Sequence, residues 1–409
     1  MQFDFDNVID RTGTNCSKWD KRNLLFGRED ILPLWVADTD FKAPEEVICA
    51  MKKRVEHGIF GYTFKSESYY NSIIKWMRER HEWDIRNEWI TFSPGIVSAI
   101  NIAINTFTNY GDKVIIQSPI YPPFYSAIEK NGRIIIDNEL LFIDARYYMD
   151  INSLNNQIRL KDTSFTSNTS IDNLEVDDRV KLLLLCNPHN PTGRVWTKEE
   201  LLKIGDICFK NNILIVSDEI HSDIVYKGNK HISIASLSEE LEQITITCMS
   251  PSKTFNLAGL STSVVIIPNR KIRSMYNNTL QTLNLGGGNI FGNIALEAAY
   301  TYGERWLAEL VLYLEENLNY LIAYFKDNIP EIKPIQPDGT YLVWLNCDGL
   351  GLEGRELMDF FVNDAKVGVN PGSTFGENGK RFVRLNFGCS RSILEEALKR
   401  IEHAVKVKK

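Results

Sequence analysis

Short apolar runs alternate with amphipathic stretches between about residues 85 and 285. Runs of this length that are bounded by turn residues are typical of buried strands, and the stretches between them carry apolar residues at helical spacing. This alternation predicts an α/β domain built on a parallel sheet. The candidate strands lie at residues 89–92, 113–117, 133–137, 181–186, 213–218, 244–249 and 262–267.

Local signals divide the rest of the chain. Thr197 is followed three residues later by Glu200, a capping-box signature that predicts a helix over 197–210. Residues 152–178 are rich in Asn, Ser, Thr and Asp with little periodicity, so we expect a polar surface excursion there. A Gly-Gly-Gly-Asn break at 286–289 precedes a helical pattern over 290–327, which is interrupted near 302–304.

Two domains are expected, because 409 residues exceed what a single core usually organises. Beyond residue 332 the pattern alternates between strand-like segments (340–345, 382–386) and helix-like segments (353–366, 391–405), which predicts a smaller α+β module. We predict an N-terminal arm with part of the small domain at 1–45, a large domain at 46–288, and a linking helix with the small domain at 289–409.

Composition narrows the class of protein. A net charge of -7 argues against a nucleic-acid surface, and the densest lysine cluster, near the C-terminus at 406–409, is expected to be a solvated tail. No apolar run approaches the ~20 residues that span a bilayer, and the acidic N-terminus lacks the features of a signal peptide. Seven scattered cysteines without C-x-x-C spacing favour a reducing compartment and give no metal-site pattern. We expect a cytoplasmic protein with no membrane, nucleic-acid or metal partner.

Three polar groups stand at the ends of apolar strands. Lys253 follows the run 244–249, Asp218 ends the run 213–218, and Asn190 follows the run 181–186 in a loop constrained by two prolines and a glycine. A buried ammonium or carboxylate is costly unless something compensates it. Each group is therefore either an exposed turn residue or one held in place for chemistry, and the three together favour chemistry.

These segments resemble the cofactor-binding set of pyridoxal-phosphate enzymes of aminotransferase class I/II. The resemblance covers nearly the whole chain. It is most specific to the MalY/PatB-type C–S lyases, also called cystathionine β-lyases of the aminotransferase fold. The motifs that carry it lie at 10–15, 18–20, 33–38, 186–191 and 370–373. Two segments depart from the family: Asp38-Thr39-Asp40 carries threonine where methionine is common, and 286–288 is unusually glycine-rich. The resemblance implies a fold-type I enzyme with a mainly parallel seven-stranded sheet and a smaller α+β domain.

The resemblance also implies a role for each candidate residue. Lys253 would bond the cofactor's aldehyde and later carry the substrate's α-proton, and Asp218 would hold the ring nitrogen protonated. Asn190 would donate to the phenolic oxygen, and His221 stands where relatives carry a tyrosine that contacts the same oxygen. Arg384 and Ala37 would bind the substrate, with the guanidinium on its carboxylate. The remaining candidates are the amides of Ile96 and Val97 and the hydroxyls of Ser250 and Ser252 for the phosphate, Tyr121 for stacking on the ring, and Tyr62 for the phosphate of a partner subunit's cofactor.

Structural alternatives stay open at several positions. Asp218 could cap a helix, Tyr121 could pack in the core, His221 could sit at a helix N-terminus, and Arg384 could lie on an exposed edge strand. If Tyr62 reaches a partner, the protein is a homodimer with a shared active site.

For the reaction, the resemblance implies α,β-elimination of cystathionine or related cysteine S-conjugates to a thiol, pyruvate and ammonia. An aminotransferase is the first alternative, and a binding or regulatory protein that retains the fold is the second.

Overall fold

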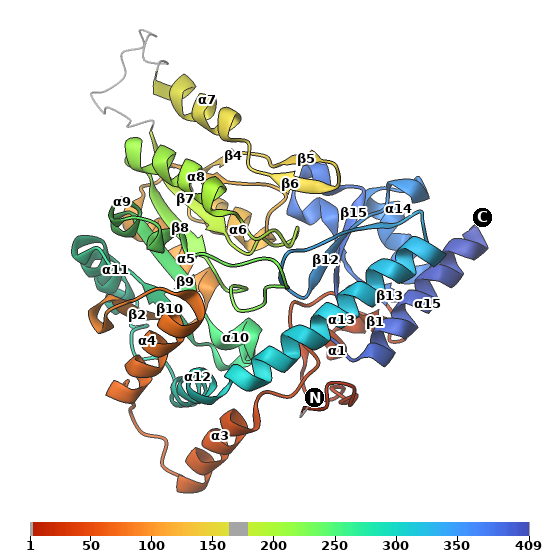
Figure 1. Cartoon of the computed structure of the whole chain (residues 1–409), viewed down its shortest axis with the longest axis horizontal. Coiled ribbons are helices and arrows are strands. Elements are labelled where there is room, and N and C mark those ends of the chain that lie inside the picture. Colours follow the sequence, from red (N-terminus) through yellow and green to blue (C-terminus); the bar gives the residue numbers. More distant parts are fainter. Residues whose placement is uncertain (1–2, 163–178, 409) are drawn as a thin grey trace.

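The computed structural model describes residues 3–162 and 179–408. Within them the main sheet has seven strands in the order β2-β10-β9-β8-β7-β3-β4 (Figure 1). Only β10 runs antiparallel to its neighbours, so the sheet is mainly parallel, as predicted. The strands are β2 (Ile90–Ser93), β3 (Lys113–Ile116), β4 (Ile134–Asp137), β7 (Val180–Cys186), β8 (Leu214–Asp218), β9 (Thr245–Met249) and β10 (Ser263–Ile266).

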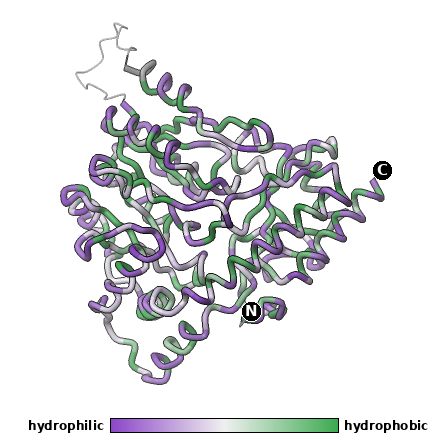
Figure 2. Tube along the Cα trace, viewed as in Figure 1, coloured by the Kyte–Doolittle hydropathy of each residue, from purple (hydrophilic) through white to green (hydrophobic). Residues whose placement is uncertain are grey.

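Both faces of this sheet are covered, which explains why its strands read as continuous apolar runs. Along β7, Leu182 and Leu184 pack in one core cluster, whereas Leu183 and Leu185 pack in another on the opposite face. Figure 2 shows hydrophobic residues along the central strands and alternating hydrophilic and hydrophobic residues along the outer helices. The first cluster includes residues of α5 (Ile96–Phe107), α6 (Pro122–Lys130) and α11 (Arg270–Thr282); the second includes residues of α7 (Ile151–Asp162) and α8 (Lys198–Lys210).

A second sheet, of order β11-β12-β15-β14, is built from the C-terminal part of the chain. Its strands are β11 (Lys333–Ile335), β12 (Leu342–Asn346), β15 (Phe382–Asn386) and β14 (Asn370–Pro371). The long helix α13 (Glu304–Asn328) and the C-terminal helix α15 (Arg391–Lys408) lie side by side next to it (Figure 1). The N-terminal arm joins this part of the molecule, because β1 (Leu32–Pro33) pairs in parallel with β13 (Val367–Gly368).

The remaining elements complete the periphery. None of the helices in the described ranges is long and apolar enough to cross a membrane. The peripheral helices and strands not yet named are α1 (Ser17–Asp20), α2 (Arg22–Phe26), α3 (Glu45–His57), α4 (Glu67–His81), β5 (Leu141–Ile143), β6 (Arg146–Tyr148), α9 (Glu239–Gln243), α10 (Pro251–Thr254), α12 (Ile290–Tyr302) and α14 (Gly354–Asp359). A π-helical turn over Phe360–Asp364 continues α14.

Several predicted boundaries are confirmed. Thr197 caps α8 with the reciprocal bonds of a capping box. The predicted interruption near 302–304 lies at Gly303, where α12 ends and α13 begins. The domain limits at residues 45 and 288 stay a prediction.

The structure corrects the secondary structure expected for two segments. Residues 152–162 belong to helix α7, not to an irregular excursion; leucine and isoleucine at helical spacing (Leu154, Ile158) pack it on the core despite its polar composition, and 163–178 lie outside the described residues. Lys406 and Lys408 of the C-terminal lysine cluster are exposed to solvent, as expected, but they belong to α15, which continues through Lys408, and not to an irregular tail. Its apolar residues Ala404 and Val405 are buried, which keeps the last turns helical.

Candidate active site

A pocket opens where strands of the main sheet end. Cys186 and Asp218 are the last residues of β7 and β8, and Ser250 follows β9 directly. Because parallel strands point their carboxyl ends to one edge, residues far apart in sequence meet there. The pocket has a volume of about 140 Å³ and is lined by Ala37, Pro94, Gly95, Ile96, Val97, Tyr121, Cys186, Asn190, Asp218, Ile220, His221, Ser250, Ser252, Lys253, Ala258, Ser261, Thr262 and Ser263.

Lys253 sits on α10, a helix of four residues. Ser250 caps this helix by accepting from the amide of Ser252 at 3.1 Å, and its hydroxyl donates to the Thr262 carbonyl at 2.8 Å. The Lys253 Nζ donates to the carbonyl oxygen of Ala37 at 2.6 Å. Burial lowers the pKa of Lys253 to about 8, which makes a neutral, nucleophilic amine accessible near neutral pH.

Asp218 is a buried carboxyl that accepts one bond, from the backbone amide of Ile220 at 3.1 Å. Burial raises the pKa of Asp218 to about 7. In residues 3–162 and 179–408 no cationic side chain lies in salt-bridge range of it. The site therefore holds a carboxyl that a cationic ligand group would stabilise in its ionised form.

Arg384 lies on the buried strand β15, so the expected alternative of an exposed edge arginine does not apply. Its guanidinium donates to three neutral oxygens: Asn190 Oδ1 at 2.9 Å, Asn370 Oδ1 at 2.8 Å and the Trp35 carbonyl at 3.1 Å. Its Nε has no hydrogen-bond partner in the part of the chain that the structure describes, and burial lowers the pKa of Arg384 to about 10. A carboxylate ligand would give this cation the counter-charge that its present partners lack.

The N-terminus of α5 borders the same pocket. Gly95 is the N-cap and provides no side-chain cap, the first turn has no acidic residue, and the space beside the Gly95 Cα is open. The amides of Ile96 and Val97 belong to the first turn, whose N–H groups have no partner within the helix. This end of α5 suits an anion such as a phosphate.

Tyr121 and His221 both line the pocket. His221 is buried, and its ring meets that of Tyr341 edge-on at 5.8 Å. Among the described residues its Nδ1 has no hydrogen-bond partner. Burial lowers the pKa of His221 well below its ordinary value, so it is a neutral donor or acceptor. The neighbouring His189 instead bonds Thr192 Oγ1 at 2.8 Å and does not line the pocket.

Two predicted residues lie apart from the pocket lining. Arg384 reaches the site through Asn190, as described. Tyr62 is fully exposed and does not line the pocket of its own chain. Ser250 and Ser252 line the pocket, but the Ser250 hydroxyl already donates within the chain.

The sequence reasoning missed three contributors. Tyr341 donates to the Ala37 carbonyl at 3.0 Å, Asn370 holds Arg384, and the hydroxyl run 261–263 forms one wall of the pocket. The hydroxyl run, which leads into a strand soon after Lys253, was a readable signal. Tyr341 lies within an apolar segment whose pattern carries no mark of the site. Asn370 belongs to the motif at 370–373 that carries the family resemblance, but that motif did not predict its contact with Arg384.

The fold and the pocket define a class, and the sequence comparison places the chain in it: the chain belongs to the aminotransferase class I and II family, whose sequence profile matches residues 29–401.

Individual proteins are similar over almost the full length. The chain is 45% identical to cystathionine beta-lyase PatB of Bacillus subtilis, over 98% of this chain and 99% of that protein. It is 32% identical to protein MalY of Escherichia coli, over 99% of each. Among solved structures, cystalysin from Treponema denticola, which contains a pyridoxal 5'-phosphate cofactor, superposes with a TM-score of 0.93 at 36% identity and covers 100% of both chains.

Proposed function

We propose that this protein is a pyridoxal-phosphate-dependent C–S β-lyase, which cleaves cystathionine or related cysteine S-conjugates to a thiol, pyruvate and ammonia. One observation carries the proposal. Lys253, which is partly exposed, and the buried Asp218 line one pocket, the buried Arg384 reaches it through Asn190, and in the described ranges none of these three charged groups has an ion-pair partner. Ionisable groups placed in a pocket without a close ion-pair partner are costly, so their retention together points to a ligand that pairs with them. The similarity to lyases over the whole chain supports the sulfur substrate.

The residues present fit pyridoxal phosphate group by group. Lys253 can bond the aldehyde, Asp218 can pair with the protonated ring nitrogen, and the amides at the start of α5 can hold the phosphate. Asn190 uses its Oδ1 for Arg384, which leaves its Nδ2 to donate to the phenolic oxygen. When bound, the cofactor supplies an electron sink for the charge that develops at the substrate's Cα.

The chain's own residues then orient the substrate and move its proton. Arg384 binds the α-carboxylate, so the bond from Cα to hydrogen faces a defined direction. The Lys253 amine, held by the Ala37 carbonyl at 2.6 Å, takes the α-proton as general base. Loss of the thiolate from Cβ, followed by hydrolysis, gives the products.

Tyr62 and its neighbours support a homodimer. Ile59, Phe60, Tyr62 and Phe64 are all large, apolar or aromatic, and exposed in the single chain. A contiguous exposed apolar segment favours an interface. We propose that Tyr62 crosses this interface to the phosphate of the partner subunit's cofactor. The seven cysteines are free thiols, which supports the proposed cytoplasmic location.

A single assay tests the activity. Purified, cofactor-loaded protein is incubated with cystathionine without any keto acid, and pyruvate and free thiol are measured. Sustained release of both in equal amounts is expected. Turnover only after a keto acid is added would identify an aminotransferase instead, and absence of turnover under both conditions would leave a binding protein.

A further inference from the structure

The irregular segment 35–41 crosses the active site. Side chains donate hydrogen bonds to the carbonyl oxygens of residues 35–39 and 41. Within the described residues this segment belongs to no strand or helix, although the Val36 carbonyl also accepts from the Asp38 amide at 2.9 Å. The donors are Arg384 to Trp35, Asn386 to Val36 and Asp38, Lys253 and Tyr341 to Ala37, Arg11 and Asn256 to Thr39, and Asn256 to Phe41. A loop held this completely acts as a rigid support.

This segment touches both groups that the proposed reaction uses. Arg384 donates to the carbonyl of Trp35 at 3.1 Å, and Lys253 donates to that of Ala37 at 2.6 Å. The substrate-binding guanidinium and the proton-carrying amine thus rest on carbonyls two residues apart. A shift of the segment changes the position of one group relative to the other.

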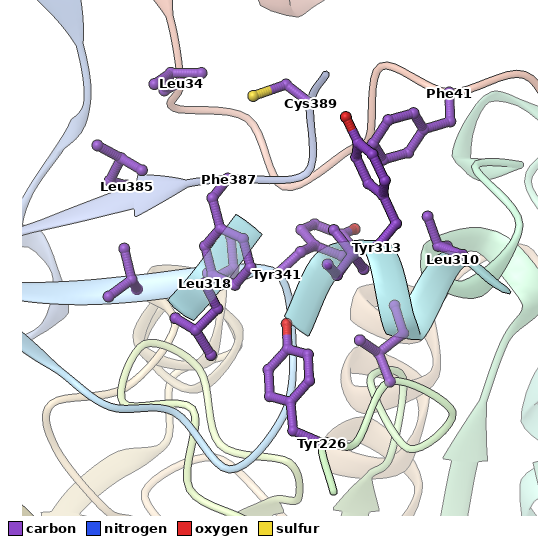
Figure 3. Close-up of a cluster of buried hydrophobic side chains, with 14 of the residues drawn as sticks. Leu34, Phe41, Tyr226, Leu310, Tyr313, Leu318, Tyr341, Leu385, Phe387 and Cys389 are labelled. Carbon is purple, nitrogen blue, oxygen red and sulfur yellow. The ribbon is translucent and has the colours of Figure 1, made fainter. Parts of the chain in front are cut away.

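Hydrophobic burial anchors the two ends of the segment. Leu34 is completely buried, and Phe41 packs edge-on against Phe5 and Tyr313 at ring distances of 5.2 and 5.7 Å. In Figure 3 Leu34 and Phe41 stand at either end of the segment, which passes Cys389 between them. In the middle of the segment, Ala37 lines the pocket and is only partly buried against the core cluster.

A cluster of four charged side chains holds the middle. Arg11 binds Asp38 through both terminal nitrogens, at 3.1 and 2.8 Å, and also binds Asp40 at 2.6 Å. Lys18, whose side chain is completely buried, binds Asp40 at 2.8 Å and lies 3.7 Å from Asp38. The two cations and two carboxylates balance, so the cluster is compensated internally and, unlike Asp218 and Arg384, calls for no ligand.

We propose that Arg11 and Lys18, from the N-terminal arm, are positioning residues for the reaction: by holding Asp38 and Asp40 they keep the segment 35–41 in the place that aligns Arg384 with Lys253. This inference rests on the proposed function of Arg384 and Lys253. It assigns the N-terminal arm a role in substrate alignment, although neither Arg11 nor Lys18 lines the pocket.

The test replaces each cation and keeps a matched control. Arg11→Gln and Lys18→Met remove one cation each, Arg11→Lys keeps the charge without the paired bonds, and Arg28→Gln breaks an exposed two-bond pair with Asp30 on the same arm. The cofactor-loaded proteins are titrated with L-alanine, an amino acid without a leaving group, and binding is followed by the visible absorbance of the cofactor. The dissociation constant is expressed per cofactor-loaded molecule, so a loss of folded protein does not change it.

We expect Arg11→Gln and Lys18→Met to weaken L-alanine binding about tenfold or more and to lower kcat with cystathionine as well, because ångström-scale misplacement of reacting groups costs up to about a hundredfold in rate. Arg11→Lys should recover part of the loss, and Arg28→Gln should match the wild type. The inference would be overturned if the folded Arg11 variants bound L-alanine with dissociation constants within about twofold of the wild type, because differences of that size are within the usual scatter of such comparisons. If Lys18→Met does not fold, Arg11→Gln decides, since Arg11 is partly exposed. L-alanine binding decides this point even if cystathionine is not cleaved, which separates it from a failure of the proposed lyase activity.

Discussion

Replacing Asp218 with asparagine should stabilise the cofactor-free protein and weaken the cofactor-bound one. Burial raises the pKa of Asp218 from 3.8 to about 7. The folded state therefore holds a proton that the unfolded state releases between these pH values, and stability falls as the pH rises through that window. A difference of about three pH units corresponds to roughly 4 kcal/mol of folding free energy, present as a penalty above pH 7 and absent below pH 4.

Asparagine has nearly the same shape and no charge to desolvate, so the variant lacks this penalty. Urea unfolding of both cofactor-free proteins at pH 5 and pH 8 measures the difference. The advantage of Asp218→Asn should grow by about 2–3 kcal/mol between the two pH values, which is the part of the window that lies between pH 5 and pH 7. Asp206→Asn, at an exposed carboxylate paired with Lys210, serves as the control and should show little change.

The cofactor-bound variant should behave in the opposite way. The lost pairing with the ring nitrogen should weaken cofactor binding and lower the elimination rate, both measured at pH 8. The reasoning is refuted if Asp218→Asn gives the same stability difference at pH 5 and pH 8, since Asp218 would then not be an uncompensated buried carboxyl.

Three further predictions concern single side chains. Arg384→Lys should raise KM for cystathionine by about tenfold to a hundredfold, since lysine cannot form the paired bonds of a guanidinium; steady-state kinetics decide, and an unchanged KM contradicts the assignment. Tyr62→Phe should weaken cofactor affinity in the proposed dimer, whereas Tyr110→Phe, at another exposed tyrosine, should not, as measured by cofactor titration. Thr197→Ala should lower the unfolding free energy by about 1 kcal/mol through loss of the helix cap, as measured in urea; a change near zero would contradict the capping role.

The sequence supported the fold because its strongest signals are local. Apolar runs, a capping box and glycine breaks each depend on neighbouring residues, and the strands and the helix start at Thr197 match them. The polar stretch that contains α7 misled the prediction, since two or three buried apolar side chains outweigh the weak helix propensity of many asparagines and serines.

The site shows the same contrast. Lys253, Asp218 and Asn190 could be recognised in the sequence because each follows or ends an apolar strand, and these strand ends are visible in the local pattern. Asn370 and Tyr341 contribute through contacts between segments distant in sequence, which no local pattern encodes. The charged cluster on the segment 35–41 is of this kind too, because Lys18 and Asp40 are 22 residues apart in the sequence and form an ion pair only in the folded arm.

The most direct test of the account locates the cofactor on the chain. The purified yellow protein is treated with borohydride, which fixes pyridoxal phosphate to the amine that carries it, then digested, and the peptides are analysed by mass spectrometry. The account predicts the added phosphopyridoxyl mass on the peptide that contains Lys253, with no label in Lys253→Ala. A label on another lysine, or an unchanged absorbance and label in Lys253→Ala, would contradict it.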